Sequence, residues 1–123
     1  MKKLSLASFA VAAVVLSTTA FAGYKLTVPV SVTSTSFTGS YGSARNSSDS
    51  LQWLFCRDNG TSAYCGARDS AGTAKSCTTT NPDHLNIVRS MVDTSRIGVT
   101  FNSSGTCTSL YQVNGSYYET LLP

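Results

Sequence analysis

Residues 64–84, YCGARDSAGTAKSCTTTNPDH, decide the fold because they join two segments of strand length, a tight turn and a helix start. The segments at residues 63–68 and 73–79 flank Asp69–Gly72. An Asp at the start and a Gly at the end suit a type I turn closed by a glycine bulge. The pattern therefore predicts an antiparallel hairpin.

A helix start follows this hairpin directly. Asn81 can cap the helix, Pro82 suits its first position, and Asp83 complements the positive end of the helix dipole. Apolar residues then recur on one helical face: Leu85, Val88, Met91 and Val92. The spacing predicts a helix over residues 82–93.

An edge strand and a second hairpin are predicted on either side of this stretch. Residues 24–33, YKLTVPVSVT, alternate apolar and polar side chains, which indicates a half-buried strand. Pro29 cannot donate a ladder hydrogen bond, so this strand should lie at a sheet edge, where another chain could add a strand. Asn102–Gly105 repeats the composition of the first turn between residues 96–101 and 106–113.

The most apolar segment, residues 51–57 (LQWLFCR), is predicted to be a buried strand at the centre of the core, with Trp53 inside. Short strands are also expected near residues 37–44 and 116–122. The predicted fold is α+β, a mostly antiparallel β-sheet with one covering helix at residues 82–93. The side chains expected to meet in its core are Leu54, Cys56, Val88, Met91, Val99 and Phe101.

The N-terminus predicts export. Two lysines precede an apolar run at residues 4–16 that is too short to cross a bilayer. Ala20-Phe21-Ala22 then matches the small-x-small pattern of a signal-peptidase site. We expect a signal peptide over residues 1–22 and a secreted or periplasmic mature chain over residues 23–123, without a membrane span. That length suits a single disulfide-stabilised domain.

Charge argues against a nucleic-acid partner. The chain has nine Lys and Arg against six Asp and Glu, and without the two leader lysines seven remain against six, a net charge of about +1. A dedicated nucleic-acid binder needs a strong basic field. Charged residues make up only 12% of the chain, so the hydrophilic surface must consist mainly of Ser, Thr, Asn and Gly.

Four cysteines in an exported chain of this length are expected to form two disulfides. The first hairpin sets Cys65 opposite Cys77, while Cys56 and Cys107 are both expected to point inward. The favoured pairing is therefore Cys65–Cys77 with Cys56–Cys107. The alternative, Cys56–Cys65 with Cys77–Cys107, requires a different loop at residues 58–62. Without a C-x-x-C pair, and with one histidine, no metal, redox site or cofactor is expected.

Two side chains could serve acid–base chemistry in a small secreted hydrolase, His84 and Glu119. Asp83 is adjacent to His84, and neighbouring positions of a helix do not face each other, so it cannot easily orient the imidazole. We therefore predict no catalytic residue. Tyr117 and Tyr118 are candidates for surface binding, because adjacent residues of an extended segment point to opposite sides and at least one should be exposed.

The remaining aromatic and cationic side chains admit two interpretations. Tyrosines in a row on a sheet can make a sugar- or protein-binding platform, but ordinary strand packing with polar tips in water is expected for most aromatic residues. The arginines have no spacing that requires an anion-binding patch, so solvated side chains are expected. The residues concerned are Tyr41, Trp53, Phe55, Tyr64 and Tyr111, and Arg45, Arg57, Arg68 and Arg96.

Three segments carry a resemblance to known proteins: GSARNSSDSLQWLFC, YCGARDSAGTAKSCTTTNP and SSGTC. They are similar to small exported bacterial proteins of unassigned activity that share a four-cysteine layout. The resemblance implies export and disulfides, and it transfers no catalytic residue. The expected function is an exported structural or binding module with an envelope, matrix or protein partner. The alternatives are a small secreted hydrolase and a protease inhibitor or toxin-like protein.

Overall fold

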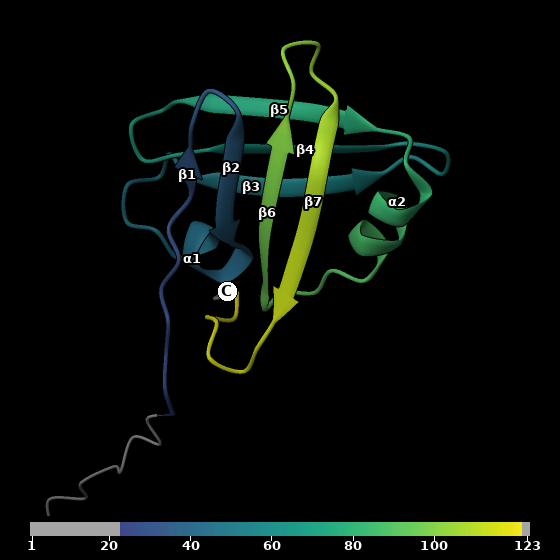
Figure 1. The fold of residues 1–123 in the computed structure, drawn as a ribbon. Helices are drawn as coiled ribbons and strands as arrows, with labels where there is room; N and C mark the ends of the chain where they lie inside the picture. Colours follow the sequence, from purple (N-terminus) through teal and green to yellow (C-terminus); the bar gives the residue numbers. More distant parts are fainter. Residues whose placement is uncertain (1–22, 122–123) are drawn as a thin grey trace, which may run out of the picture.

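Residues 23–121 of the computed structural model are described, and they form two antiparallel sheets that pack against each other (Figure 1). The strand order is β1-β2-β6-β7 in one sheet and β3-β4-β5 in the other. The predicted signal peptide over residues 1–22 lies outside the described residues. The elements are β1 (Ser31–Val32), β2 (Ser36–Ser40), α1 (Tyr41–Arg45), β3 (Trp53–Asp58), β4 (Ala63–Arg68), β5 (Ala74–Thr79), α2 (Pro82–Arg89), β6 (Ser95–Phe101) and β7 (Cys107–Asn114).

Both predicted hairpins are confirmed, and each is closed by the expected turn. The β4–β5 turn places Gly72 at φ 86°, and the β6–β7 turn places Gly105 at φ 77°, a region that glycine adopts without steric cost. The carboxylate of Asp69 and the side-chain carbonyl of Asn102 each accept hydrogen bonds from two backbone N–H groups of their turns. The turn residues therefore determine the register of the four strands they connect.

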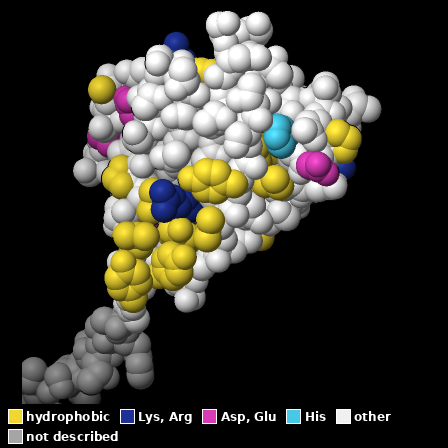
Figure 2. All heavy atoms as spheres, in the orientation of Figure 1, with side chains coloured by type: hydrophobic (Ala, Val, Ile, Leu, Met, Phe, Trp, Pro, Cys, Tyr) yellow, Lys and Arg dark blue, Asp and Glu magenta, His cyan; other side chains and the backbone are white. Residues whose placement is uncertain are grey.

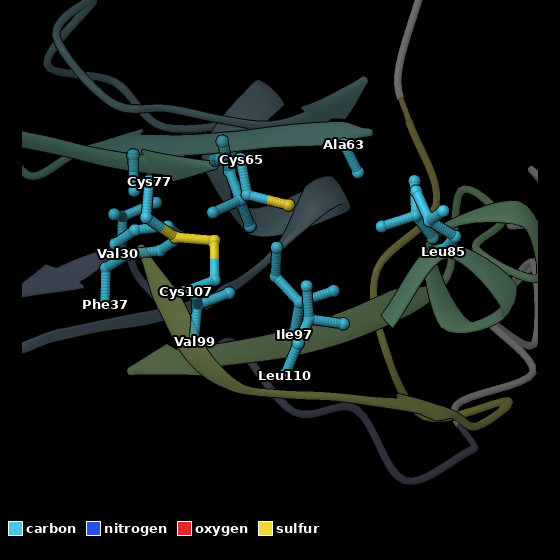
Figure 3. Packing of buried hydrophobic residues seen from close by; sticks show 14 residues of the cluster. Val30, Phe37, Ala63, Cys65, Cys77, Leu85, Ile97, Val99, Cys107 and Leu110 are labelled. Carbon is cyan, nitrogen blue, oxygen red and sulfur yellow. A yellow bond between two sulfur atoms is a disulfide. The ribbon is translucent and has the colours of Figure 1, made fainter. Parts of the chain in front are cut away.

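The core lies where the strands of the two sheets cross (Figure 3). Phe37, Ile97 and Val99 are almost fully buried on the inner face of the four-stranded sheet, against Cys65 and Ala67 of β4. The α+β, mostly antiparallel prediction is confirmed, but the sheets cover each other rather than one sheet being covered by a helix alone. The core residues named from the sequence do gather here: Leu54, Val88 and Val99 are buried, and Cys56, Met91 and Phe101 pack against the cluster.

Helix α2 contributes two buried side chains, Leu85 and Val88, to this core. Its N-terminus is capped as predicted, because the Asn81 side chain accepts a 2.9 Å hydrogen bond from the Asp83 N–H. The predicted end at residue 93 is wrong, since α2 ends at Arg89 and leaves Val92 exposed. Backbone turns then lead into β6, so the apolar spacing at Met91 and Val92 belongs to the connection rather than to the helix.

The N-terminal segment follows the sheet edge as predicted but pairs over only two residues, Ser31–Val32. Upstream, side chains replace the strand ladder: the Val28 N–H donates to Ser43 Oγ and the Val30 N–H donates to Gln52 Oε1, each at 2.9 Å. Two further strand predictions need correction, because residues 41–45 form α1 and residues 116–121 form no strand. A single bridge, Leu26 to Tyr118, joins the two terminal segments instead.

The favoured disulfide pairing is wrong, because the bridges are Cys56–Cys65 and Cys77–Cys107. Cys65 does lie opposite Cys77, but it also lies opposite Cys56 on its other neighbouring strand. A tight turn, closed by a 2.8 Å hydrogen bond from the Asn59 N–H to the Ser62 carbonyl, brings Cys56 and Cys65 to a Cα–Cα distance of 4.1 Å.

The second disulfide, Cys77–Cys107, joins the two sheets where they contact each other. The Thr78 N–H donates a 2.9 Å hydrogen bond to the Gly105 carbonyl, which places β5 beside the start of β7. Cys77 then meets Cys107 across the sheets at a Cα–Cα distance of 5.1 Å (Figure 3). The two cysteines have a sequence separation of 30 and lie on strands of different sheets, so hairpin geometry alone could not reveal their contact.

A tryptic digest under non-reducing conditions should report this connectivity directly. Cleavage after the lysines and arginines separates the four cysteines into four peptides, residues 46–57, 58–68, 76–89 and 97–123. We expect peptide 46–57 to be joined to 58–68, and 76–89 to 97–123, with both links lost on reduction. A link between peptides 58–68 and 76–89, identified by mass spectrometry, would contradict the structure.

Candidate binding surface

The outer face of the three-stranded sheet carries a concentrated set of aromatic and cationic side chains. Side chains alternate between the two faces of a strand, and Leu54, Cys65 and Cys77 occupy the inner face. The outward positions that the register brings together are Trp53, Phe55 and Arg57 on β3, Tyr64, Gly66 and Arg68 on β4, and Ala74, Ser76 and Thr78 on β5. None of these outward positions is an aspartate or a glutamate.

Three rings on this face form a continuous row, which we call the aromatic ladder: Trp53, Phe55 and Tyr64. The ring centroids are 5.5 Å apart for Trp53 and Phe55, and 5.4 Å apart for Phe55 and Tyr64. Gly66 lies opposite Phe55, and a Cβ atom there would stand 3.0 Å from the Phe55 ring. The missing side chain at Gly66 therefore leaves room for the Phe55 ring over β4.

An arginine stands at each end of the aromatic ladder. The Arg57 guanidinium lies over the Tyr64 ring at 5.6 Å from its centroid, and that of Arg68 lies over the Trp53 ring at 5.8 Å. Both distances suit a cation–π contact. Arg68 also donates from Nε to the Leu51 carbonyl. Within residues 23–121 no ion pair holds either guanidinium, because the one salt bridge joins other residues, so both retain donors for a ligand.

The prediction that Trp53 lies in the core is wrong. Leu54 takes the inward position of β3, and strand alternation then turns Trp53 and Phe55 to the outer face, where both remain half-buried against each other. The apolar run at residues 51–57 hides this alternation, since both faces carry large apolar side chains. The inward placement of Cys56 and Leu54 was the available signal that residues 53 and 55 face outward.

A second group of aromatic side chains lies on the outer face of the four-stranded sheet and the terminal segments (Figure 2). Tyr24 and Tyr117 have ring centroids 6.0 Å apart, and the Tyr111 ring covers Gly98 on the neighbouring strand. Tyr117 is half-buried, whereas Tyr118 is only 5% exposed and therefore packs against the protein. Binding through Tyr117 stays a prediction, and Tyr118 offers little surface to a partner.

A hollow of about 750 Å³ opens between α1, β3 and α2. Tyr41 is the most perturbed titratable group on its wall, since burial raises the pKa of its phenol to about 12. Its hydroxyl lies 3.3 Å from the Met91 sulfur. The Tyr41 hydroxyl therefore already donates its hydrogen bond within the wall of the hollow, to another lining side chain.

The two candidate acid–base residues lie on separate elements and make separate hydrogen bonds. His84 Nδ1 is 2.8 Å from Thr79 Oγ1, and that same oxygen accepts from the Asn81 N–H, so the imidazole takes part in the start of α2. The Glu119 carboxylate accepts a 2.8 Å hydrogen bond from the Thr27 hydroxyl. No interaction among residues 23–121 joins His84 to Glu119.

The part of the chain that the structure describes contains neither a cluster of metal ligands nor a membrane-spanning helix. Within residues 23–121, no group of three or more His, Cys, Asp and Glu side chains is placed to hold a metal ion. In the same part of the chain, no helix has the length and apolar character needed to cross a bilayer. The two disulfides are of the kind that persists in an oxidising, extracellular-type compartment.

No protein-family model, curated protein or solved structure matches this chain. The resemblance to four-cysteine exported proteins therefore stays a prediction. The geometry and chemistry of the chain's own side chains are what indicate its function.

Proposed function

We propose that this protein is an exported, non-enzymatic binding module that contacts its ligand through the aromatic ladder. The observation that carries the proposal is the row of Trp53, Phe55 and Tyr64 on an outer sheet face, flanked by Arg57 and Arg68. Aromatic and arginine side chains provide most of the binding energy at protein recognition sites. None of these rings belongs to the core cluster between the sheets, so the fold does not require them for packing there.

Rigidity of the underlying sheet supports a binding role for the aromatic ladder. Directly beneath it, β3 and β4 are joined by a full six-residue register and by the Cys56–Cys65 disulfide. Side chains on strands held in this way are positioned before a ligand arrives, which reduces the entropy lost on binding. A module of this kind needs no conformational change to present its rings.

Export is supported by two independent features. The first residues of the chain have the charged start, short apolar run and Ala20-Phe21-Ala22 end of a signal peptide. The disulfides require an oxidising compartment to form and persist. Secretion to the medium and retention in the periplasm both satisfy these requirements.

A binding panel tests the proposed function. The mature chain and its Trp53→Ala variant would be titrated against immobilised neutral and acidic polysaccharides and against a purified envelope fraction. We expect at least one probe to bind the parent chain, and Trp53→Ala to weaken that binding about tenfold or more, because truncating an aromatic anchor of a binding site removes about 2 kcal/mol.

Tyr24→Ala is the matched control for this experiment. Tyr24 is 73% exposed and its ring lies beside Tyr117 rather than beside a ring of the ladder, so its loss should leave ladder-dependent binding unchanged. Thermal unfolding followed by circular dichroism would verify that both variants remain folded. If no probe binds, or if Trp53→Ala binds every probe as the parent does, the aromatic ladder is not a binding site.

A further inference from the structure

We infer that the ligand of the aromatic ladder is an acidic polysaccharide whose sugar rings carry carboxylates. This inference rests on the proposed function, because it names the ligand class of the same surface. It is drawn from the aromatic rings, the arginines at the ends of the ladder, the hydroxyl groups beside it and the lack of any carboxylate at the outward positions.

The rings provide an apolar platform for an extended polymer. Sugar rings present C–H groups on their faces, and these pack favourably against aromatic side chains. The steps of 5.5 Å and 5.4 Å between successive ring centroids follow the sheet surface and suit a chain of sugar rings better than a single small molecule. Tyr64 and Trp53 also carry polar atoms that can bond to water or hydroxyls at the edges of the platform.

The arginines add a requirement for negative charge. Arg57 lies opposite Tyr64 and Arg68 lies opposite Trp53, so the two cations are separated by four residues of β3, about 13 Å at roughly 3.3 Å per residue. A polymer lying along the rings would therefore meet a guanidinium at both ends. Guanidinium groups bind carboxylates in a planar, two-bond geometry, so the carboxylates of an acidic sugar polymer can pair with both arginines.

Hydroxyl groups complete the surface on the side of β5. Ser76 lies opposite Gly66, and Thr78 lies opposite Tyr64, both at outward positions beside the rings. Short hydroxyl side chains of this kind can exchange hydrogen bonds with sugar hydroxyls. The nearest acidic residue in β3, Asp58, takes the inward phase and forms a 2.6 Å ion pair with Arg89, so it does not oppose an anionic ligand on this face.

A single-stranded nucleic acid would also stack on aromatic rings, but the charge of the protein favours the polysaccharide. Nucleic-acid grooves follow the phosphate backbone with many basic residues, and binding strength depends on that number. Here residues 23–123 carry a net charge of about +1, since seven Lys and Arg face six Asp and Glu. Two arginines at the ends of a row give two guanidinium contacts to carboxylates, rather than a groove of basic residues that follows a phosphate backbone.

The test compares two polymers that differ only in charge, polygalacturonate and its carboxyl-reduced, neutral form, measured by calorimetry against the mature chain. We expect polygalacturonate to bind at least tenfold more tightly than the neutral polymer. The double variant Arg57→Gln/Arg68→Gln should bind both polymers with the affinity that the parent shows for the neutral form. Trp53→Ala should weaken binding to both polymers.

A charge-matched control separates the arginines of this face from the net charge of the protein. Arg96 takes the outward phase of β6 in the four-stranded sheet, since Ile97 faces the core, and Lys25 precedes the bridge from Leu26 to Tyr118. Lys25→Gln/Arg96→Gln therefore removes two positive charges away from the three-stranded sheet and should keep the preference for polygalacturonate. If this control abolishes the preference as fully as the arginine double variant does, the effect is one of overall charge and the inference is wrong.

The remaining outcomes distinguish this inference from the proposed function. If the acidic and neutral polymers bind equally and Trp53→Ala weakens both, the inference of an acidic ligand is wrong, whereas the proposed binding function is supported. Binding of oligothymidylate in preference to polygalacturonate would replace the polysaccharide with a nucleic acid. No binding of any probe across the panel would overturn both proposals.

Discussion

Replacing Phe37 with alanine should lower the free energy of unfolding by about 3–5 kcal/mol, the range seen when a large aromatic side chain is removed from a core. Phe37 is the second residue of β2, is 0% exposed, and has its ring centroid 5.9 Å from that of Phe101. Neighbouring strands hold it from both sides, through pairing with Val32 and with Val99. The backbone therefore cannot collapse to fill the cavity that the substitution leaves.

Chemical denaturation with urea, followed by tryptophan fluorescence and circular dichroism, would measure this loss. Phe55→Ala is the matched control, since it removes the same side chain from the outer face, where the half-buried Phe55 ring packs beside Trp53 and Tyr64. We expect Phe55→Ala to cost clearly less than Phe37→Ala. Equal losses would mean that the outer face contributes to stability as a core does, which contradicts the two-sheet packing.

Removing the Cys77–Cys107 bridge is the second change with a large expected effect. The bridge closes a loop with a sequence separation of 30, which corresponds to about 3.5 kcal/mol of lost unfolded-chain entropy. The Cys56–Cys65 bridge closes a loop with a separation of 9, worth about 2.5 kcal/mol by the same relation. Cys77–Cys107 is also the only disulfide that joins the two sheets among the described residues, because Cys56–Cys65 lies within one sheet.

Double alanine variants compare the two bridges without leaving free thiols. We expect Cys77→Ala/Cys107→Ala to lower the unfolding temperature by about 15 °C or more, since each 1 kcal/mol shifts it by about 4–8 °C in a domain of this size. Cys56→Ala/Cys65→Ala should lower it less. Calorimetric scans at equal pH and salt would compare the unfolding temperatures of the two variants. The reverse order would show that the disulfide within one sheet stabilises the fold more than the disulfide between the sheets.

These stability determinants lie apart from the aromatic ladder. The inner faces of the two sheets hold the buried cluster and the Cys77–Cys107 bridge, whereas the rings and arginines occupy the outward phase of β3 and β4. Substitutions at Arg57 and Arg68 should therefore change binding with little effect on folding, because surface cation–π contacts contribute only about 0.5–1 kcal/mol. This separation makes the binding experiments interpretable.

The candidate surface was only partly predictable from the sequence. The sequence indicates that tyrosines in a row on a sheet can make a binding platform, but it predicts a buried strand at residues 51–57 with Trp53 inside. Both faces of this strand are apolar, so its composition does not reveal which face meets the other sheet. The pairing of β3 with β4 settles the question, because it turns Cys56 and Cys65 inward together and leaves Trp53 and Phe55 outside.

Local sequence determined the turns, the helix cap and most strand positions of this protein. These features form through short-range steric and hydrogen-bonding preferences, which depend on neighbouring residues and not on the rest of the fold. The segments concerned are Asp69–Gly72, Asn102–Gly105 and Asn81–Asp83. Only the tertiary structure decided the disulfide partners, the crossing of two sheets and the exposure of the aromatic ladder. Each of these features depends on contacts between segments far apart in the chain, such as β5 with the β6–β7 turn. The local sequence pattern of a segment does not specify which distant segment will pack against it.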